Sequence, residues 1–254
     1  MKEEPNNNKL VKSKILFLIS ILFVYFILFE FILPYNKILP KPSMLLESFI
    51  SIWIDYSLVE TMAITTTTIY FTLAVSYIVI FLFSSYLLKI FFEYSEVIEK
   101  LKIFRYFPAF FFAILFSYWF ANSIAAEILF AFLSSCLLMI SAFLTSAKTC
   151  NRTYVDVAMN LGLKKTDIYR QVIFKNIQPK FISEFSRIHY YLWILVMIYE
   201  FINEINGFGG VYRTALTYND FTGLFSIAIV ISVLIWFGSI IINFLNEKIV
   251  FWEA

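Results

Sequence analysis

Long, continuous apolar runs separated by short polar segments dominate the chain. A helix needs about 20 mostly apolar residues to cross the hydrocarbon core of a bilayer, which is about 30 Å thick. Six runs approach or exceed that length, and we predict a helix for each: residues 15–33, 61–92, 104–120, 124–147, 181–202 and 221–244. Because these runs are continuous rather than alternating, they predict an all-α, polytopic transmembrane helix bundle.

Composition supports a membrane protein. Hydrophobic residues make up 61% and charged residues 15% of the 254 residues, whereas soluble domains average about 45–50% and about 25%. The first run is too long for a signal peptide and ends at Leu33-Pro34-Tyr35 without a small-residue cleavage site, so we expect it to remain as an anchor. We interpret residues 1–14 as a polar tail and residues 15–254 as one transmembrane domain.

The distribution of positive charge predicts the orientation of this domain. Cytoplasmic loops of membrane proteins carry an excess of Lys and Arg. With the N-terminus in the cytoplasm, only Lys37, Lys41 and Arg213 of the 20 Lys and Arg residues fall outside, when Arg187 is counted at the inner edge. We therefore expect a multi-pass protein of the inner (cytoplasmic) membrane with a cytoplasmic tail and both termini cytoplasmic.

The longest polar connection, residues 148–180, carries signals of ordered structure. Thr153 and Asp156 have the spacing of a capping box. Residues 154–161 then provide about two helical turns, and Gly162 suits the left-handed position that ends a helix. These signals predict a short helix followed by a glycine bend.

A second short helix is expected after the bend. Thr166 can cap it, Ile168 and Val172 lie on one face, and Pro179 precedes the next span. The whole loop is either an ordinary ordered connector or a docking surface for a cytoplasmic partner, because a short amphipathic helix can fill a groove.

The order of residues in this loop resembles a known family. The sequence Asp156-x-Ala158-x-x-x-Gly162, followed by an apolar-basic stretch and Pro179, is similar to the "EAA" loop of ABC-importer permeases. This resemblance implies a type I importer permease fold, with the helix at residues 153–162 as the ATPase-docking element.

Two further segments resemble the nitrate/sulfonate/taurine branch of these importers. Arg105-Tyr-Phe-Pro108-Ala109, followed by Trp119-Phe120, is similar to the third-span segment of that branch. Glu200, followed by Gly207-Phe208-Gly209, is similar to its acidic residue and Gly-Leu-Gly segment. The motifs occur in the expected order between residue 61 and the C-terminus.

The chain also departs from the pattern. Asp156 and Val157 stand where Glu and Ala are usual, and Lys175 stands where such loops commonly carry a proline. No glycine precedes Gly162, although small residues let membrane helices approach closely. The chain therefore resembles a divergent member, in which either Ala63 and the Thr65–Thr68 run allow close packing or aromatic side chains space the helices further apart.

The resemblance implies a set of partners and roles. The partners would be an ABC ATPase dimer that binds ATP and Mg, a second permease copy or paralogue, an extracytoplasmic substrate-binding protein and membrane lipid. Docking would fall on Tyr154, Asp156, Ala158, Leu161 and Gly162. Substrates of the branch include small oxyanions, sulfonates and vitamin-like heterocycles, and no intramembrane cluster of Lys or Arg marks an anion site.

The chain itself is expected to be non-catalytic. It lacks the GxxxxGK[S/T] loop that holds nucleotide phosphates, so ATP hydrolysis belongs to a partner and we expect no cofactor here. Cys136 and Cys150 are expected to be free thiols, and His189 is the single histidine, so we predict no metal site. Nucleic acid is not an expected partner.

Residues 203–220, on the predicted outer side, contain half of the chain's six glycines. The segment is either a plain turn between two spans or a gate or re-entrant loop that meets the substrate-binding protein. In the second interpretation Glu200, Gly207 and Gly209 would line or gate the translocation path.

For the other ionisable residues in or near spans we expect structural or interfacial roles. Glu184 and Arg187 are three residues apart and are expected to pair on one helical face rather than to bind substrate. Glu30, Glu60 and Glu127 are expected at the outer edge, within reach of water.

Two alternatives to a working permease half exist. The chain could be a degenerate half that acts as a scaffold or interaction subunit beside a second permease, which the missing glycines and the altered loop favour. A stand-alone secondary carrier is disfavoured, because we find no paired inverted halves.

Overall fold

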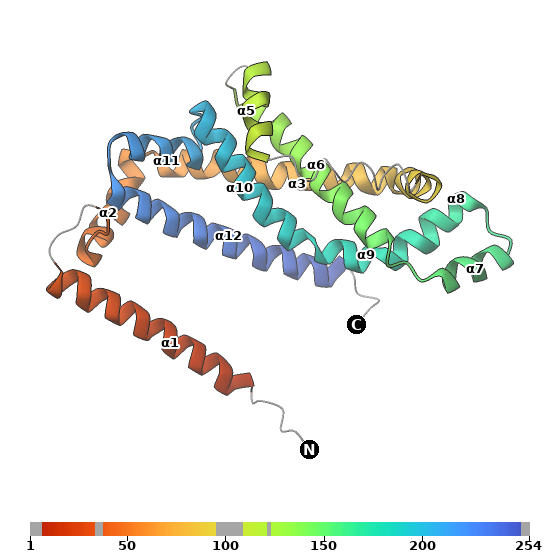
Figure 1. Cartoon of the computed structure of the whole chain (residues 1–254), viewed down its shortest axis with the longest axis horizontal. Coiled ribbons are helices and arrows are strands. Elements are labelled where there is room, and N and C mark those ends of the chain that lie inside the picture. Colours follow the sequence, from red (N-terminus) through yellow and green to blue (C-terminus); the bar gives the residue numbers. More distant parts are fainter. Residues whose placement is uncertain (1–6, 34–37, 95–108, 121–122, 250–254) are drawn as a thin grey trace. The chain divides into compact units, whose positions relative to one another are not determined.

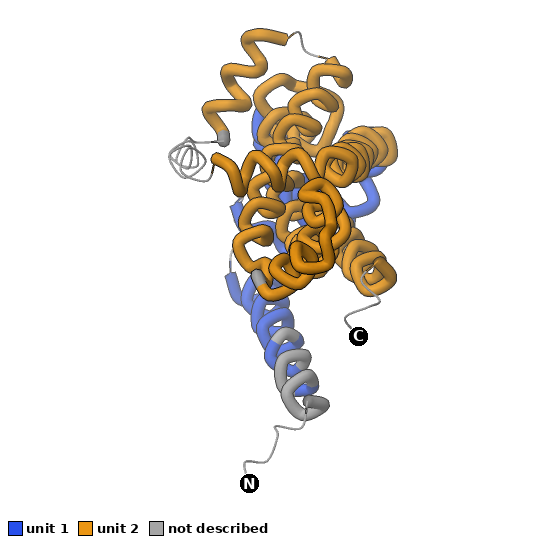
Figure 2. The backbone as a smooth tube through the Cα atoms, turned by 90° about the vertical axis from the view of Figure 1, so that its right-hand side faces the viewer, with its two compact units in different colours: residues 1–58, 214–230 blue, residues 59–213, 231–254 orange. Residues whose placement is uncertain are grey.

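All regular secondary structure in the described residues is helical. The computed structural model describes residues 7–33, 38–94, 109–120 and 123–249 (Figure 1). Part of the predicted third span, including Arg105 and Pro108, lies outside these residues. The chain divides into two compact units, residues 1–58 with 214–230 and residues 59–213 with 231–254 (Figure 2).

Unit 1 contains α1 (Asn7–Ile27), the π-helical turn η1 (Leu28–Ile32), α2 (Pro42–Asp55) and the first residues of α12 (Phe221–Ile249). The Tyr25 hydroxyl donates to the carbonyl of Pro40 at 2.8 Å. The Tyr56 hydroxyl, just after α2, donates to the Asp220 carboxylate at 2.7 Å. These long-range hydrogen bonds hold α2 at both of its ends.

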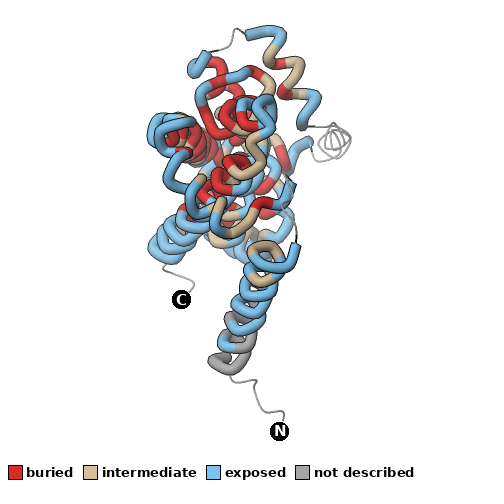
Figure 3. The backbone as a smooth tube through the Cα atoms, turned by 90° about the vertical axis from the view of Figure 1, so that its left-hand side faces the viewer, coloured by how far each residue is buried: buried red, intermediate tan, exposed pale blue. Residues whose placement is uncertain are grey.

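Unit 2 contains most of the helical bundle. Its elements are α3 (Leu58–Glu93) from its second residue, α5 (Ala109–Trp119), α6 (Ile124–Ala147), α7 (Arg152–Asn160), α8 (Lys165–Asp167), η3 (Ile168–Ile173), α9 (Phe174–Ser183), α10 (Phe185–Asn203), the part of α11 (Phe208–Thr217) up to Arg213, and α12 from Ile231. Buried positions are concentrated in this unit, whereas the described residues of α1 are exposed or intermediate (Figure 3).

α10 lies at the centre of the packing in unit 2. It packs against α5 and α6, and its buried side chains recur every three or four residues from Phe185 to Asn203, as expected for one helical face. Near its end, the rings of Tyr199 and Phe130 stack with centroids 4.6 Å apart. Phe116 of α5 adds an edge-on contact to the same aromatic cluster.

Three of the predicted spans coincide with helices long and apolar enough to cross a membrane: α3, α6 and α12. The 36 residues of α3 correspond to roughly 54 Å at 1.5 Å per residue, so this helix can tilt or extend beyond the bilayer. Residues 19–32 and 110–119 form shorter apolar helices. The prediction of an all-α membrane helix bundle is confirmed.

Three local predictions need correction. The cap of α7 is Asn151, whose Oδ1 accepts the Thr153 N–H at 3.0 Å, because Asn is as effective a cap as Thr and precedes it. Lys164, rather than Thr166, precedes the helix after the bend. Pro179 does precede α10, but it lies inside α9 and not in a connecting segment.

Among the described residues, two helices lie outside both the six predicted spans and the predicted helices of the 148–180 loop. α2 occupies residues left without an assigned element, and α11 occupies most of the segment 203–220, so the plain-turn interpretation of that segment is wrong. Each helix is shorter than a span, which is why a search for long apolar runs does not find it.

Candidate functional site

α7 presents apolar side chains outward. The side chain of Ala158 is buried. Those of Tyr154, Val157 and Met159 are about half exposed, and that of Leu161 is 76% exposed. A nine-residue helix that turns this much apolar surface away from its own protein is typical of a helix that fills a groove in a partner.

Gly162 ends this helix in the predicted left-handed conformation, with a φ of +74°. Its N–H donates to the Met159 carbonyl at 3.0 Å, and the Leu163 N–H donates to the Ala158 carbonyl at 3.2 Å. These bonds satisfy carbonyls at the helix end. The predicted helix and glycine bend are confirmed, and α7 forms a hairpin with the segment that begins at α8 (Figure 1).

A hollow lies on each side of α7. One, of about 760 Å³, is lined by Tyr154, Ala158 and Leu161 together with Val172 and Pro179. The structure therefore groups three of the five predicted docking residues on one face.

The second hollow, of about 600 Å³, is lined by Asp156 and Met159 of α7, by Phe91 and Phe92 of α3 and by Ile168 of η3. Asp156 thus lies on a different side of α7 from the other predicted docking side chains. Cys150 lines the same hollow as a free thiol. Partial burial raises the pKa of the Cys150 thiol.

The second predicted group, Glu200 with Gly207 and Gly209, also comes together. The Glu200 carboxylate is fully buried at the end of α10. Its Oε1 accepts the Thr65 hydroxyl at 2.6 Å, and its Oε2 accepts the Gly209 N–H at 2.8 Å. The Thr65 oxygen in turn accepts the Phe208 N–H at 3.0 Å. Glu200 and Thr65 therefore satisfy free N–H groups at the N-terminus of α11, where a carboxylate is electrostatically favoured.

The glycines permit this close approach. A Cβ atom at Gly207 would overlap the Glu200 carboxylate, and one at Gly209 would overlap the Met197 carbonyl oxygen. Sequence reasoning identified the glycines and the acid but missed Thr65, which lies 135 residues away from Glu200.

A second set of contacts, made by Arg213, stabilises the junction between α10 and α11. Glu204 ends α10 in the left-handed region, with a φ of +53°. Arg213 donates to the carbonyls of Phe201 and Ile202 at 3.2 and 3.1 Å and forms an ion pair with Glu204 at 2.6 Å. A cation is favoured at the C-terminal end of a helix, so Arg213 fixes how α11 leaves α10.

Glu127 differs from its predicted position at a wet edge. Its carboxyl group is fully buried in the first turn of α6, beside Thr68 and Glu200, and neither oxygen has a well-aligned hydrogen bond to a described residue. It lies close enough to Glu200 for the two groups to interact electrostatically. A buried carboxylate without a partner is costly.

Glu200→Gln is expected to destabilise the bundle, whereas Glu127→Gln is not. The Glu200→Gln variant leaves the Thr65 hydroxyl or the Gly209 N–H without an acceptor, a loss of about 1–3 kcal/mol. The Glu127→Gln variant removes an unpartnered acid and is expected to be neutral or stabilising. The midpoint of thermal unfolding in one detergent measures both. Equal destabilisation by the two variants would show that Glu127 also has a structural partner.

His189 lies in the bundle core rather than in an open site. Its Nε2 accepts the Trp193 indole N–H at 2.8 Å and lies 3.1 Å from the Tyr70 hydroxyl. Gly238 of α12 packs against the same groups, since a Cβ there would overlap the Tyr70 oxygen. The single histidine therefore helps join three helices.

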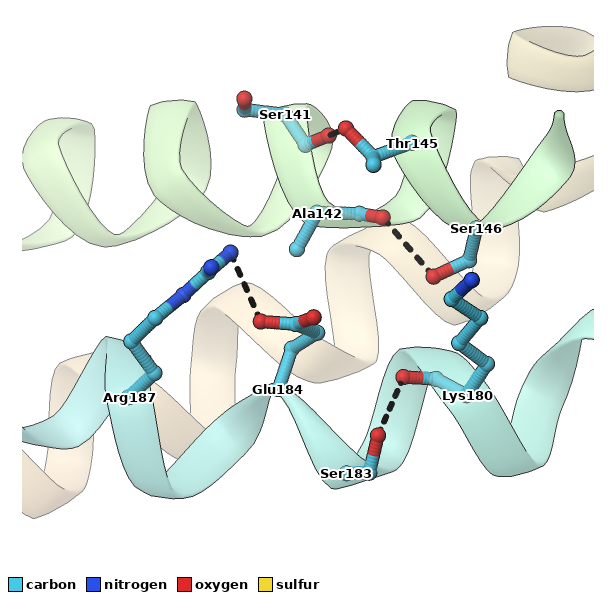
Figure 4. Close-up of polar contacts among 8 residues, drawn as sticks. All are labelled: Ser141, Ala142, Thr145, Ser146, Lys180, Ser183, Glu184 and Arg187. Carbon is cyan, nitrogen blue, oxygen red and sulfur yellow. Dashed lines mark hydrogen bonds and ion pairs between the residues drawn. The ribbon is translucent and has the colours of Figure 1, made fainter. Parts of the chain in front are cut away.

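The predicted Glu184–Arg187 pair is confirmed at 2.7 Å, at the junction of α9 and α10 (Figure 4). Nearby hydroxyl groups bond within their own helices, as when Ser146 of α6 donates to the Ala142 carbonyl at 3.0 Å (Figure 4). Partly exposed ion pairs of this kind contribute little to stability, and the arrangement is that of a structural contact.

Comparison with known proteins identifies one matching family model. The model of the binding-protein-dependent transport system inner membrane component matches residues 101–251, which is more than half of the chain. No curated protein and no solved structure matches the chain. The matched region contains α7, the Gly162 bend, Glu200 and the glycines at the start of α11.

Proposed function

Because the chain belongs to the family of binding-protein-dependent transport system inner membrane components, we propose that α7 docks into a separate ATPase subunit. Membership makes the chain a multi-pass membrane permease subunit of an ABC transporter, a family of non-catalytic transporter components. The finer proposal is that it forms part of the translocation path of a bacterial importer and receives the energy of ATP hydrolysis through residues 153–162.

The single observation that carries the docking proposal is the outward apolar face of α7. Tyr154, Val157 and Leu161 recur at the spacing of one helical face, and all three are more than half exposed. Gly162 holds the helix in a hairpin against η3, so the face is already formed before a partner binds. A rigid, exposed apolar face loses little conformational entropy when a partner covers it.

We propose three kinds of partner for this chain in the assembled transporter. An ABC ATPase dimer would bind ATP and Mg, a second permease copy or paralogue would complete the pore, and an extracytoplasmic protein would deliver the substrate. Within the family, we propose that the chain is a member of the nitrate/sulfonate/taurine branch. Its substrate would then be a small oxyanion, a sulfonate or a vitamin-like heterocycle. Both termini are proposed to be cytoplasmic.

One observation favours the alternative of a scaffold half beside a second permease. Glu200 is fully buried, and both of its oxygens accept hydrogen bonds from within unit 2. Glu200, Gly207 and Gly209 then act as a structural junction, and the substrate path would be lined mainly by the partner permease. Cross-linking of substrate to the assembled complex distinguishes the two, because a scaffold half would not be labelled.

Purification of the tagged chain from its native membranes in a mild detergent tests the docking proposal. We expect a polypeptide with a GxxxxGK[S/T] loop to co-purify and to hydrolyse ATP in the complex. Recovery of the chain without such an ATPase, from membranes that contain it, would overturn the proposal.

A further inference from the structure

α2 carries an exposed apolar face that its own unit does not cover. Leu46, Ile50 and Ile54 are each more than 70% exposed, and Phe49 and Trp53 flank them with more than a third of their surfaces exposed. At 100° per residue these five side chains occupy one continuous side of the helix.

The other two sides of α2 have different characters. Ile52 is buried against unit 1, and the Ser226 hydroxyl reaches the Leu45 carbonyl at 3.5 Å on that side. Glu47, Ser51 and Asp55 form an exposed polar side next to the apolar one. Besides its buried side, the helix therefore has an exposed surface that is amphipathic, with an apolar side next to a polar one.

α2 is too short to cross a bilayer. Its 14 residues span roughly 21 Å at 1.5 Å per residue, compared with about 30 Å of hydrocarbon. A short helix with one apolar and one polar side can instead lie in the membrane interface, with its apolar side among the acyl chains.

Connectivity places α2 at a membrane surface. It follows α1 and η1, which form the apolar first helix, and Leu58, the first residue of the long span α3, comes three residues after its end. Glu30 of η1 also caps it, because its carboxylate oxygens accept the Ser43 N–H at 3.1 Å and the Ser43 hydroxyl at 2.9 Å. A helix joined to an apolar helix on one side and to a long apolar span on the other is held close to the membrane interface.

We propose that α2 lies in the plane of the membrane–water interface, with Leu46, Ile50 and Ile54 inserted among lipid acyl chains. Trp53 lies on the same side, and Trp is enriched at this depth of a bilayer. The exposed polar side is acidic, so attachment rests on burial of apolar surface and does not require anionic lipid. The proposal goes beyond ATPase docking and does not depend on it.

Spin labels at two positions of α2 test the proposal. Ile50→Cys and Glu47→Cys are labelled separately in the full chain carrying Cys136→Ser and Cys150→Ser, reconstituted into phosphatidylcholine vesicles with and without anionic lipid. Power saturation compares the access of oxygen, which concentrates in lipid, with that of a water-soluble nickel complex. We expect the ratio of oxygen to nickel access to be several-fold higher at position 50 than at position 47, with the same result in both lipid mixtures.

Three results would overturn the proposal. Equal nickel access at both positions would place the apolar side in water. Spin–spin broadening at position 50 would show that a second copy of the chain covers it. A ratio that rises only with anionic lipid would mean that charge, and not apolar burial, holds the helix at the membrane.

Discussion

Replacing Gly209 with alanine is expected to prevent the chain from forming a stable bundle. The new Cβ would overlap the Met197 carbonyl oxygen and lie 2.7 Å from the Phe201 nitrogen, both backbone atoms of α10. Overpacking costs about 1–3 kcal/mol where neighbouring side chains can shift. Here a helix backbone must move and the hydrogen bond from Gly209 to Glu200 is lost with it, so we expect a loss of at least about 3 kcal/mol.

Gly162→Ala is the matched control for this change. It adds the same methyl group at a glycine, but no atom lies within 4 Å of the new Cβ, and only the positive φ of +74° opposes it. A left-handed residue with a side chain costs about 1–2 kcal/mol. Thermal unfolding and the monodisperse fraction after detergent extraction should both rank the wild type first, Gly162→Ala next and Gly209→Ala last. Equal yields and midpoints for the two variants would contradict the packing of α11 on α10.

The comparison between these two glycines shows what sequence can reveal. Gly162 follows a short amphipathic pattern and has the local context of a helix end, so its left-handed conformation could be predicted from neighbouring residues alone. Gly209 is required by backbone atoms of another helix, and nothing near it in sequence indicates that. The glycines in this segment are compatible with a plain turn. In the structure they instead lie at the start of α11, which packs against α10.

Long-range partners were beyond sequence reasoning for the same reason. The continuous apolar runs of α3, α6 and α12 predicted spans because length and composition alone decide whether a helix suits a bilayer. Thr65 was noticed only as a small residue within a span. Its role as the partner of Glu200 depends on how α3 packs against α10, which periodicity does not specify. Glu127 was placed at a wet edge because its burial likewise depends on tertiary packing.

α2 could not be predicted by searching either for membrane spans or for helices of soluble proteins. A search for spans rejects 14 residues as too short, and a search for soluble amphipathic helices expects the apolar side to be buried. In α2 the most apolar side is the exposed one, with Leu46, Ile50 and Ile54 on it. Where lipid is the solvent, exposure of an apolar face is consistent with stability, so the helix becomes interpretable only with the membrane in view.

Leu161→Glu is expected to uncouple the chain from its ATPase while leaving the bundle intact. Leu161 is 76% exposed at the end of α7, so a charge there costs the isolated chain little. In the docked complex the same carboxylate would enter an apolar groove without a partner, which is costly. A central interface residue contributes about 2 kcal/mol or more, so we expect ATPase affinity to fall by about 30-fold or more.

Tyr218→Glu is the matched control, because Tyr218 is also 76% exposed and lies just beyond α11, far from α7 in sequence. Co-purification of the ATPase and transport in vesicles should both be lost in Leu161→Glu and retained in Tyr218→Glu, with equal thermal stability in detergent. If Leu161→Glu still binds the ATPase, the outward face of α7 is not the docking surface. If both variants lose it, the effect arises from added charge in general. Loss confined to Leu161→Glu would mean that the apolar side of this short helix, held by the Gly162 bend, connects ATP hydrolysis to the membrane bundle.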